Sequence, residues 1–316
     1  MDIFLYTPFN VALNIIVVFA SILVLWKGAD FLVDSASRVA ERLGVSDLVI
    51  GLTVVAMGTS APEFAVTMNA ALRGQPDISV GNIVGSNIFN LGFILGTVAI
   101  IKSVEASRRL VYRDCVFMIL VTAMLFFFFR DFMFTRLEGA IMVAALAAYL
   151  IFLFLDKVPL EDKDLPHDKA TWKDGLVLPL SIAAVVAGGH LLVGSAIYLA
   201  GQAGVSQWAI GVTIVAAGTS APEMAASIAA VLKGKHGMSA GNLIGSDIFN
   251  ILGILGLTGI IHPMAITPGA FSSFLMLNAM VVLVFVFFRT GWKISRTEGF
   301  VLVGIGIFRW VFDFMK

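Results

Sequence analysis

The sequence has little cysteine and little charge. Its one cysteine, Cys115, can form no internal disulfide and has no second thiolate with which to hold a metal ion. Only 13% of the residues are charged, and 21 Lys and Arg balance 21 Asp and Glu, so nothing indicates binding to nucleic acid. Soluble domains carry roughly 25% charged residues, and this composition therefore argues against a soluble protein.

The sequence is rich in long apolar segments. Hydrophobic residues make up 59% of the 316 residues, and the mean hydropathy is +0.96. Segments near the length needed to cross roughly 30 Å of hydrocarbon recur along the chain. No Lys or Arg precedes the first of them, so it is interpreted as a membrane helix and not as a signal peptide. The pattern predicts an all-α polytopic membrane protein whose ten transmembrane helices cover residues 11–33, 48–72, 78–101, 110–129, 137–155, 175–200, 208–232, 238–261, 270–288 and 299–314.

The two halves of the chain repeat each other. A shift of 160 residues aligns them in register, so that residues 51–63 match 211–223 at 10 of 13 positions, and residues 81–96 match 241–256 at 10 of 16. We predict a first five-helix repeat at 1–155 with its motifs in 51–96, a cytoplasmic linker at 156–174, and a second repeat at 175–316 with its motifs in 211–256. Five spans is an odd number, so the second repeat is expected to be inverted in the membrane.

The Lys and Arg residues indicate the orientation of the chain. With the N-terminus outside, fifteen of them fall in the cytoplasmic connectors and five on the opposite side, with Lys27 inside the first span left uncounted. Cytoplasmic loops carry an excess of Lys and Arg. Both termini are therefore predicted to lie outside.

The chemistry is expected to centre on two glutamates. Glu63 and Glu223 occupy matched positions deep in the second and seventh predicted spans, within two copies of Gly-Thr-Ser-Ala-Pro-Glu. An ionisable residue at this depth costs several kcal/mol, so it indicates function. On a continuous helix the hydroxyls of Thr59 and Ser60 share the face of Glu63, and Thr219 and Ser220 repeat the arrangement beside Glu223. Each copy should thus present its own cluster of oxygens.

Two further features add polar backbone and side chains. Pro62 and Pro222 each remove a backbone hydrogen bond, which opens or bends the helix and frees a carbonyl. The third and eighth spans carry Gly-Asn-x-x-Gly-Ser-x-Ile-Phe-Asn, whose Gly-x-x-x-Gly spacing we interpret as close helix packing. In each copy a serine and an asparagine four residues apart share one helix face: Ser86 with Asn90, and Ser246 with Asn250.

This set of ligands contains carboxylates, hydroxyls and amides, with no histidine or cysteine. Oxygen ligands in such number suit calcium, and subsets of them suit sodium. Two carboxylates balance one Ca²⁺ or two Na⁺. An empty site with two bare carboxylates is costly to pass through an occluded state, which favours exchange over leak.

The paired motifs resemble the alpha repeats of the sodium/calcium exchanger family, within the calcium:cation antiporter superfamily, and the resemblance covers essentially the whole chain. It implies that spans two, three, seven and eight enclose the ions while spans one and six slide as a gating pair. It also implies that Glu63 and Glu223 are shared Ca²⁺ and Na⁺ ligands. The remaining implied ligands are hydroxyls and carbonyls: Thr59, Ser60, Thr219, Ser220, Ser86 and Ser246, with backbone help near Ala56 and Ala216.

The sequence departs from one pattern in the family. Some members carry an aspartate where this chain has Asn250, and that acid is linked to potassium co-transport or to a protonated site. Both Asn90 and Asn250 are amides here, so we expect no potassium dependence and a site charge of −2. Asp247 is expected to face away from Asn250 in a packing or interface role, and Asp30 and Asp34 to be solvated at a helix end or to line the ion entrance.

The leading interpretation is antiport of Ca²⁺ against Na⁺ by alternating access, without a prosthetic group. The chain is expected to act as a monomer in the plasma (inner) membrane, and its expected partners are small cations and lipid. Exchange of H⁺ for Ca²⁺ or another divalent cation is the alternative, since protonation of either glutamate could replace sodium binding. A passive channel is disfavoured by the inverted repeat with broken helices. An enzyme is disfavoured because no His-Glu-x-x-His or comparable motif is present.

Overall fold

A computed structural model describes residues 11–156, 173–204, 216–267 and 270–315. In these residues seven helices are long and apolar enough to cross a membrane, and a bent pair, Asp47–Thr59 with Ala61–Leu72, makes an eighth. The seven are Val11–Leu43, Pro76–Ile101, Leu110–Asp131, Arg136–Leu155, Asp174–Gln202, His236–Ile261 and Phe271–Gly291. The prediction of an all-α polytopic membrane protein is confirmed.

The predicted count of ten is not matched helix for helix. Residues 208–215 of the seventh predicted span lie outside the described residues, and its remainder includes the 12-residue helix α12 (Ala221–Leu232). The tenth predicted span corresponds to helix α16 (Arg296–Met315), which is not one of the seven long apolar helices. The predicted linker also falls almost wholly outside the described part of the chain, at residues 157–172.

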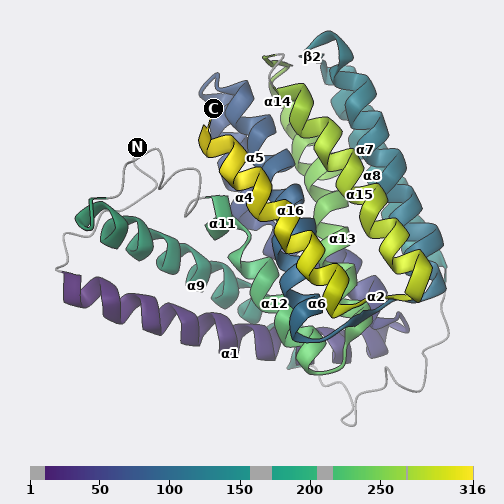
Figure 1. The fold of residues 1–316 in the computed structure, drawn as a ribbon. Helices are drawn as coiled ribbons and strands as arrows, with labels where there is room; N and C mark the ends of the chain where they lie inside the picture. The colour runs from purple at the N-terminus through teal and green to yellow at the C-terminus, as the bar shows by residue number, and fades with distance from the viewer. Residues whose placement is uncertain (1–10, 157–172, 205–215, 268–269, 316) are drawn as a thin grey trace.

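Helices α1 (Val11–Leu43) and α9 (Asp174–Gln202) lie side by side at one edge of the bundle (Figure 1). They cross at a pair of glycines: a Cβ atom at Gly28 would lie 2.9 Å from Val185, and one at Gly188 would lie 3.2 Å from Leu25. The contact of Gly28 with Val185 is thus repeated by Gly188 with Leu25, with each residue shifted by 160 positions, as a two-fold relation between antiparallel helices requires. Helix α1 extends ten residues beyond the predicted span, because polar residues continue the helix until Gly44 ends it at a φ of 68°.

The segments that carry the motifs form the centre of the bundle. They are α2 (Asp47–Ile50), η1 (Gly51–Val55), α3 (Ala56–Thr59), α4 (Ala61–Leu72), α5 (Pro76–Phe89), η2 (Asn90–Ile94) and α6 (Leu95–Ile101) in the first half. Their counterparts are α11 (Ala216–Thr219), α12, α13 (His236–Ile248), η6 (Phe249–Leu255) and α14 (Gly256–Ile261). Helices α5 and α13 continue into wide π-helical turns at η2 and η6, near Asn90 and Asn250. Such turns are frequent at functional sites.

Outer helices flank this centre. They are η3 (Leu110–Cys115) with α7 (Val116–Phe128) and η4 (Phe129–Asp131), then α8 (Arg136–Leu155), α15 (Phe271–Gly291) and α16. Thr135 and Glu138 cap the start of α8 reciprocally, and Ser295 and Glu298 do the same for α16. The caps explain why both helices begin before the predicted starts at 137 and 299.

Two short antiparallel strand pairs link the connectors. Strand β1 (Val104–Glu105) pairs with β4 (Lys293–Ile294), and β2 (Met133–Phe134) pairs with β3 (Met264–Ala265). The two pairs are again copies of each other at an offset of 160. Each joins connectors that the charge pattern had placed on the same side of the membrane, so the structure agrees with the predicted relative sidedness.

Candidate cation site

The two acidic motifs break their helices at the predicted place. Ser60 separates α3 from α4 with φ −77° and ψ 10°, and the two helices meet at a bend of 49°. Ser220 separates α11 from α12 with φ −89° and ψ 10°. Pro62 and Pro222 lie in the first turn of the following helix, where a missing N–H costs little. Broken helices of this kind form the ion sites of many secondary transporters.

The carboxylates bond across the two repeats. The Ser60 hydroxyl donates to Oε1 of Glu223 at 3.0 Å, and the Ser220 hydroxyl donates to Oε1 of Glu63 at 3.0 Å. All four side chains are fully buried. The expectation that each serine lies on the face of its own glutamate is wrong, because the helix break rotates the serine away and toward the other repeat. The site is therefore one shared structure and not two separate clusters.

The threonines and the Ala56 carbonyl lie at the same place. Thr59, which is buried, donates to the Ala56 carbonyl at 3.3 Å and to Oδ1 of Asn242 at 3.2 Å. Ser246 donates to the Ala56 carbonyl at 3.4 Å, and both Thr59 and Ser246 also interact with Glu223. In the other copy Thr219 is half-buried and interacts with Glu63. Ala216 begins α11 at the matched backbone position.

Two asparagines that our sequence-based ligand set omitted hold the broken helices. Asn82 donates to Oγ1 of Thr67 at 2.9 Å and to the Glu63 carbonyl at 3.4 Å. Asn242 makes the same bonds to Ser227 and to the Glu223 carbonyl. Both asparagines follow the first glycine of the second motif in each repeat, so the repeat itself was the available signal. They fix α4 and α12 against α5 and α13.

The predicted asparagine ligands belong to a buried network. Asn90 donates to Oδ1 of Asp247 at 2.9 Å, and Asn250 donates to Oδ1 of Asn87 at 2.9 Å. Asn87 in turn donates to the Asp247 backbone carbonyl at 3.1 Å. Asp247 is fully buried with its carboxylate against Asn90 of the other repeat, which agrees with the expected packing or interface role. Ser86, also buried, donates only to the Ile83 carbonyl among the described bonds.

Several oxygen atoms of these side chains accept no hydrogen bond from any described residue. They are Oε2 of Glu63, Oε2 of Glu223, Oδ1 of Asn90, Oδ1 of Asn250 and Oδ2 of Asp247. Buried acceptors without partners are rare because their desolvation is not compensated. In the described part of the chain no three His, Cys, Asp or Glu side chains are grouped closely enough to hold one metal ion. The acceptors are therefore suited to oxygen coordination that mixes carboxylates with neutral groups.

Comparisons with known proteins agree with this geometry. The profile of the family described as sodium/calcium exchanger protein matches residues 13–155 and 174–312. This chain belongs to that family. It is 32% identical over 342 residues to the sodium/calcium exchanger MaX1 of Methanosarcina acetivorans, covering 93% of this chain and 96% of the relative. It is 38% identical over 303 residues to CaxA of Alkalimonas amylolytica, a candidate antiporter by name, covering 92% and 95%.

A solved structure of the sodium-calcium exchanger NCX_Mj matches with a TM-score of 0.84 and 29% identity, covering 95% of this chain and 98% of that one. The chain is therefore an integral membrane cation antiporter of the exchanger type and not an enzyme. The expected family is confirmed.

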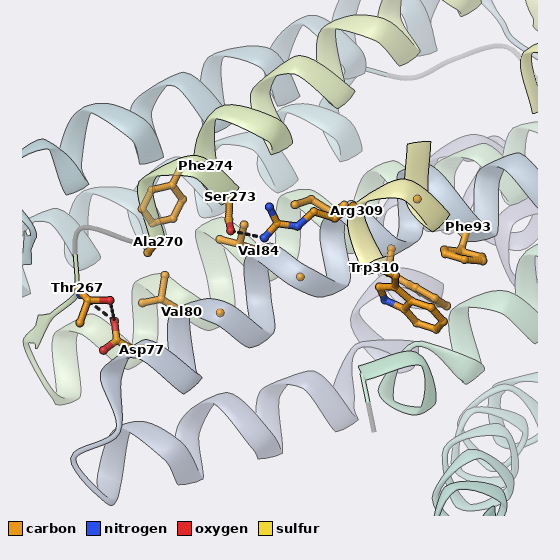
Figure 2. Close-up of a pocket in the computed structure, with 15 residues that line it drawn as sticks. Asp77, Val80, Val84, Phe93, Thr267, Ala270, Ser273, Phe274, Arg309 and Trp310 are labelled. Atoms are coloured by element: carbon orange, nitrogen blue, oxygen red, sulfur yellow. Dashed lines mark hydrogen bonds between the residues drawn. The ribbon is translucent and has the colours of Figure 1, made fainter. Parts of the chain in front are cut away.

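A cavity of about 450 Å³ in this exchanger lies between α5, α15 and α16 and contains none of the predicted ligands (Figure 2). Its polar lining is paired: Asp77 accepts from Thr267, and Arg309 donates to Ser273. Gly81 and Gly85 line it, and a Cβ atom at either would meet no described atom within 4 Å. Their counterparts Gly241 and Gly245 pack against Leu48 and Leu52, as the Gly-x-x-x-Gly spacing predicted. In the first copy the matching partners, residues 208 and 212, lie outside the described residues.

Proposed function

We propose that this antiporter exchanges Ca²⁺ for Na⁺ by alternating access around Glu63 and Glu223. The side-chain ligands in this proposal are carboxylates, hydroxyls and amides from both repeats: Glu63, Glu223, Thr59, Thr219, Ser60, Ser220, Ser86, Ser246, Asn90 and Asn250. The backbone carbonyls near Ala56 and Ala216 complete the set, and no prosthetic group takes part.

The observation that carries the proposal is the crosswise bonding of Ser60 to Glu223 and of Ser220 to Glu63. It supports a single site that needs both repeats, at the middle of the chain's two-fold relation. Each glutamate keeps one carboxylate oxygen that accepts nothing from the described residues. Hard oxygen atoms in this arrangement fit Ca²⁺ and Na⁺ better than softer metals.

Charge explains why ions should be exchanged and not leak. Two buried carboxylates without a cation carry a large desolvation cost, so the empty site is unfavourable in an occluded state. One Ca²⁺ or two Na⁺ remove that charge. We infer that the protein passes between its two open states mainly when it is loaded, and that α1 and α9, which contact each other at Gly28 and Gly188, move as a pair.

We also propose how the chain is placed. Residues 1–155 and 175–316 form the inverted repeats, joined by a cytoplasmic linker at 156–174, and the chain lies in the plasma (inner) membrane with both termini outside. The excess of Lys and Arg in the connectors near α2, β1 and β4 supports that orientation. A monomer contains the whole proposed site.

The proposal can be tested with purified protein in liposomes. Calcium uptake should follow an imposed Na⁺ gradient, and Glu63→Gln or Glu223→Gln should abolish it. Glu105→Gln is the matched control, because Glu105 is an exposed carboxylate on β1 that lies outside both motifs, and it should leave uptake unchanged.

Replacing the Na⁺ gradient with a proton gradient distinguishes Na⁺/Ca²⁺ exchange from the alternative, H⁺/Ca²⁺ exchange. Uptake driven by protons and not by sodium would show that the site exchanges H⁺ for Ca²⁺ and that the sodium proposal is wrong. Uptake that persists in both glutamine variants would show that the two glutamates are not the ion ligands.

A further inference from the structure

Helices α1 and α9 are related by the repeat, but their C-terminal halves are packed differently. Ala36 and Ala40 of α1 are 0% and 1% exposed, whereas the matched residues of α9, Ala196 and Ala200, are partly exposed. The structure is therefore closed around the C-terminal half of α1 and more open around that of α9. In the proposed orientation these are the cytoplasmic side and the outer side of the membrane.

A lysine at the end of α12 spans the closed side. The Lys233 ammonium lies 2.7 Å from Oδ1 of Asp34 and 3.3 Å from Oδ1 of Asp30, and both acids belong to α1. The same ammonium donates to the Asp30 backbone carbonyl at 2.9 Å. One cation of the central bundle thus holds two successive turns of α1.

A second polar contact joins α1 to the centre on the same side. Ser37 of α1 donates to Oδ1 of Asp47 at 2.8 Å, and Oδ2 of Asp47 lies 2.9 Å from the Lys235 ammonium. Asp47 is buried, so solvent and salt screen this ion pair less than an exposed one. The C-terminal half of α1 is therefore connected to the central helices at two places.

The second repeat does not copy these charges. At the offset of 160, the three acids of α1 and α2 are replaced by residues without a carboxylate, namely His190, Gly194 and Gln207. Lys233 is replaced by Arg73, which donates to Asn69 within its own helix. The two-fold relation that holds for the glutamates and serines of the site thus fails for the ion pairs at the two ends.

We propose that Lys233, Asp30 and Asp34 form an ionic latch that holds the cytoplasmic side closed, and that the matched positions on the outer side carry no such latch. The inference rests on the proposed alternating access, in which α1 and α9 move as a pair against the central helices. Opening toward the cytoplasm must then separate Lys233 from both acids, whereas opening toward the outside breaks no matched ion pair. The latch therefore favours the outward-open state over the inward-open state.

The competing role is a contact that only stiffens the end of α1. Two single-cysteine reporters separate the roles: Ala36→Cys on the closed side and Ala196→Cys on the open side, each with the buried Cys115 replaced by alanine. The rate at which a water-soluble maleimide modifies each reporter is measured in the purified full-length protein, first with saturating Na⁺ and then with saturating Ca²⁺.

Lys233→Gln should raise the modification rate of the Ala36→Cys reporter about fivefold, the factor that a partly exposed ion pair supplies. It should lower the rate of the Ala196→Cys reporter, because the two sides open alternately. A contact that only stiffens α1 would not lower the second rate. The exchanged pair Lys233→Asp with Asp34→Lys should restore both rates, since it reforms an ion pair of opposite polarity.

Arg38→Gln is the matched control. Arg38 also forms an ion pair from α1, at 2.6 Å, but its partner Asp174 belongs to α9. Both groups move together in the proposed mechanism, so loss of this pair should leave the rates of the two reporters unchanged.

Unchanged rates in Lys233→Gln, or equal increases at both reporters, overturn the latch. Reporter rates that respond to neither Na⁺ nor Ca²⁺ in the otherwise unchanged protein contradict alternating access and overturn the latch with it. Calcium uptake driven by protons in place of sodium would overturn the proposed choice of ions and leave the latch intact, because the reporters measure which side is open and not which cation is exchanged.

Discussion

Ser60 and Glu223 lie 163 positions apart in the chain and are joined by a buried hydrogen bond of 3.0 Å, which Ser220 and Glu63 repeat. The two acidic motifs are therefore coupled directly and not through their own helices. Each glutamate depends on the other repeat for the hydroxyl that orients it. Loss of one hydroxyl should consequently affect the carboxylate that lies far away in sequence.

Ser60→Ala should weaken Ca²⁺ binding by about tenfold. A hydrogen bond to a charged group contributes about 1.5–3 kcal/mol, and about 1.4 kcal/mol corresponds to a factor of ten. Calcium affinity of the purified protein, measured by calorimetry, checks the size of the effect. A double-mutant cycle then checks its origin. Ser60→Ala should couple strongly to Glu223→Gln and weakly to Glu63→Gln, and the reverse order would mean that the serine acts on its own motif.

Lys233→Gln should loosen the contact between α1 and the end of α12. The Lys233 ammonium lies 2.7 Å from Asp34 and 3.3 Å from Asp30, and both acids had been expected to be solvated or to line the ion entrance. These groups are partly exposed, so the ion pairs should contribute only about 1 kcal/mol, or a factor of about five in an equilibrium. Amide hydrogen exchange near residues 30–43 should become correspondingly faster.

Arg73→Gln is the matched control for this contact. Arg73 occupies the equivalent position at the offset of 160, is exposed, and donates to Asn69 within its own helix. The Arg73→Gln variant should leave amide hydrogen exchange in α1 unchanged. Equal acceleration in both variants would mean that charge loss at the surface, and not the link to α1, controls the helix.

Local signals in the sequence were sufficient for much of the fold. The long apolar segments predicted the helices. The repeat at an offset of 160 residues predicted the positions of both helix breaks, because Pro62 and Pro222 act through their own backbone. The direction in which the break turns Ser60 could not be predicted, since it depends on a partner 163 residues away. The contact between Asp247 and Asn90 could not be predicted either, because the two residues are 157 positions apart and belong to different repeats.

Gly245→Ala should destabilise the contact between α13 and η1. A Cβ atom at Gly245 would lie 2.6 Å from both the Cα and the carbonyl oxygen of Leu52, and backbone atoms cannot move aside as a side chain end can. Overpacking of this kind costs about 1–3 kcal/mol. The thermal unfolding midpoint of the protein in detergent should fall, and calcium uptake should fall with it, because Ser246 is the next residue in the chain.

Gly85→Ala is the matched substitution in the first repeat. The residue that corresponds to Leu52, at position 212, lies outside the described part of the chain. Because the two halves repeat each other in register here, alanine at Gly85 should lower the unfolding midpoint as Gly245→Ala does. Equal loss of stability in the two variants would indicate that close packing at the second glycine of the motif is common to both repeats. A loss confined to Gly245→Ala would show that the two-fold relation, which holds for the glutamates and serines, does not extend to the packing of α5 and α13.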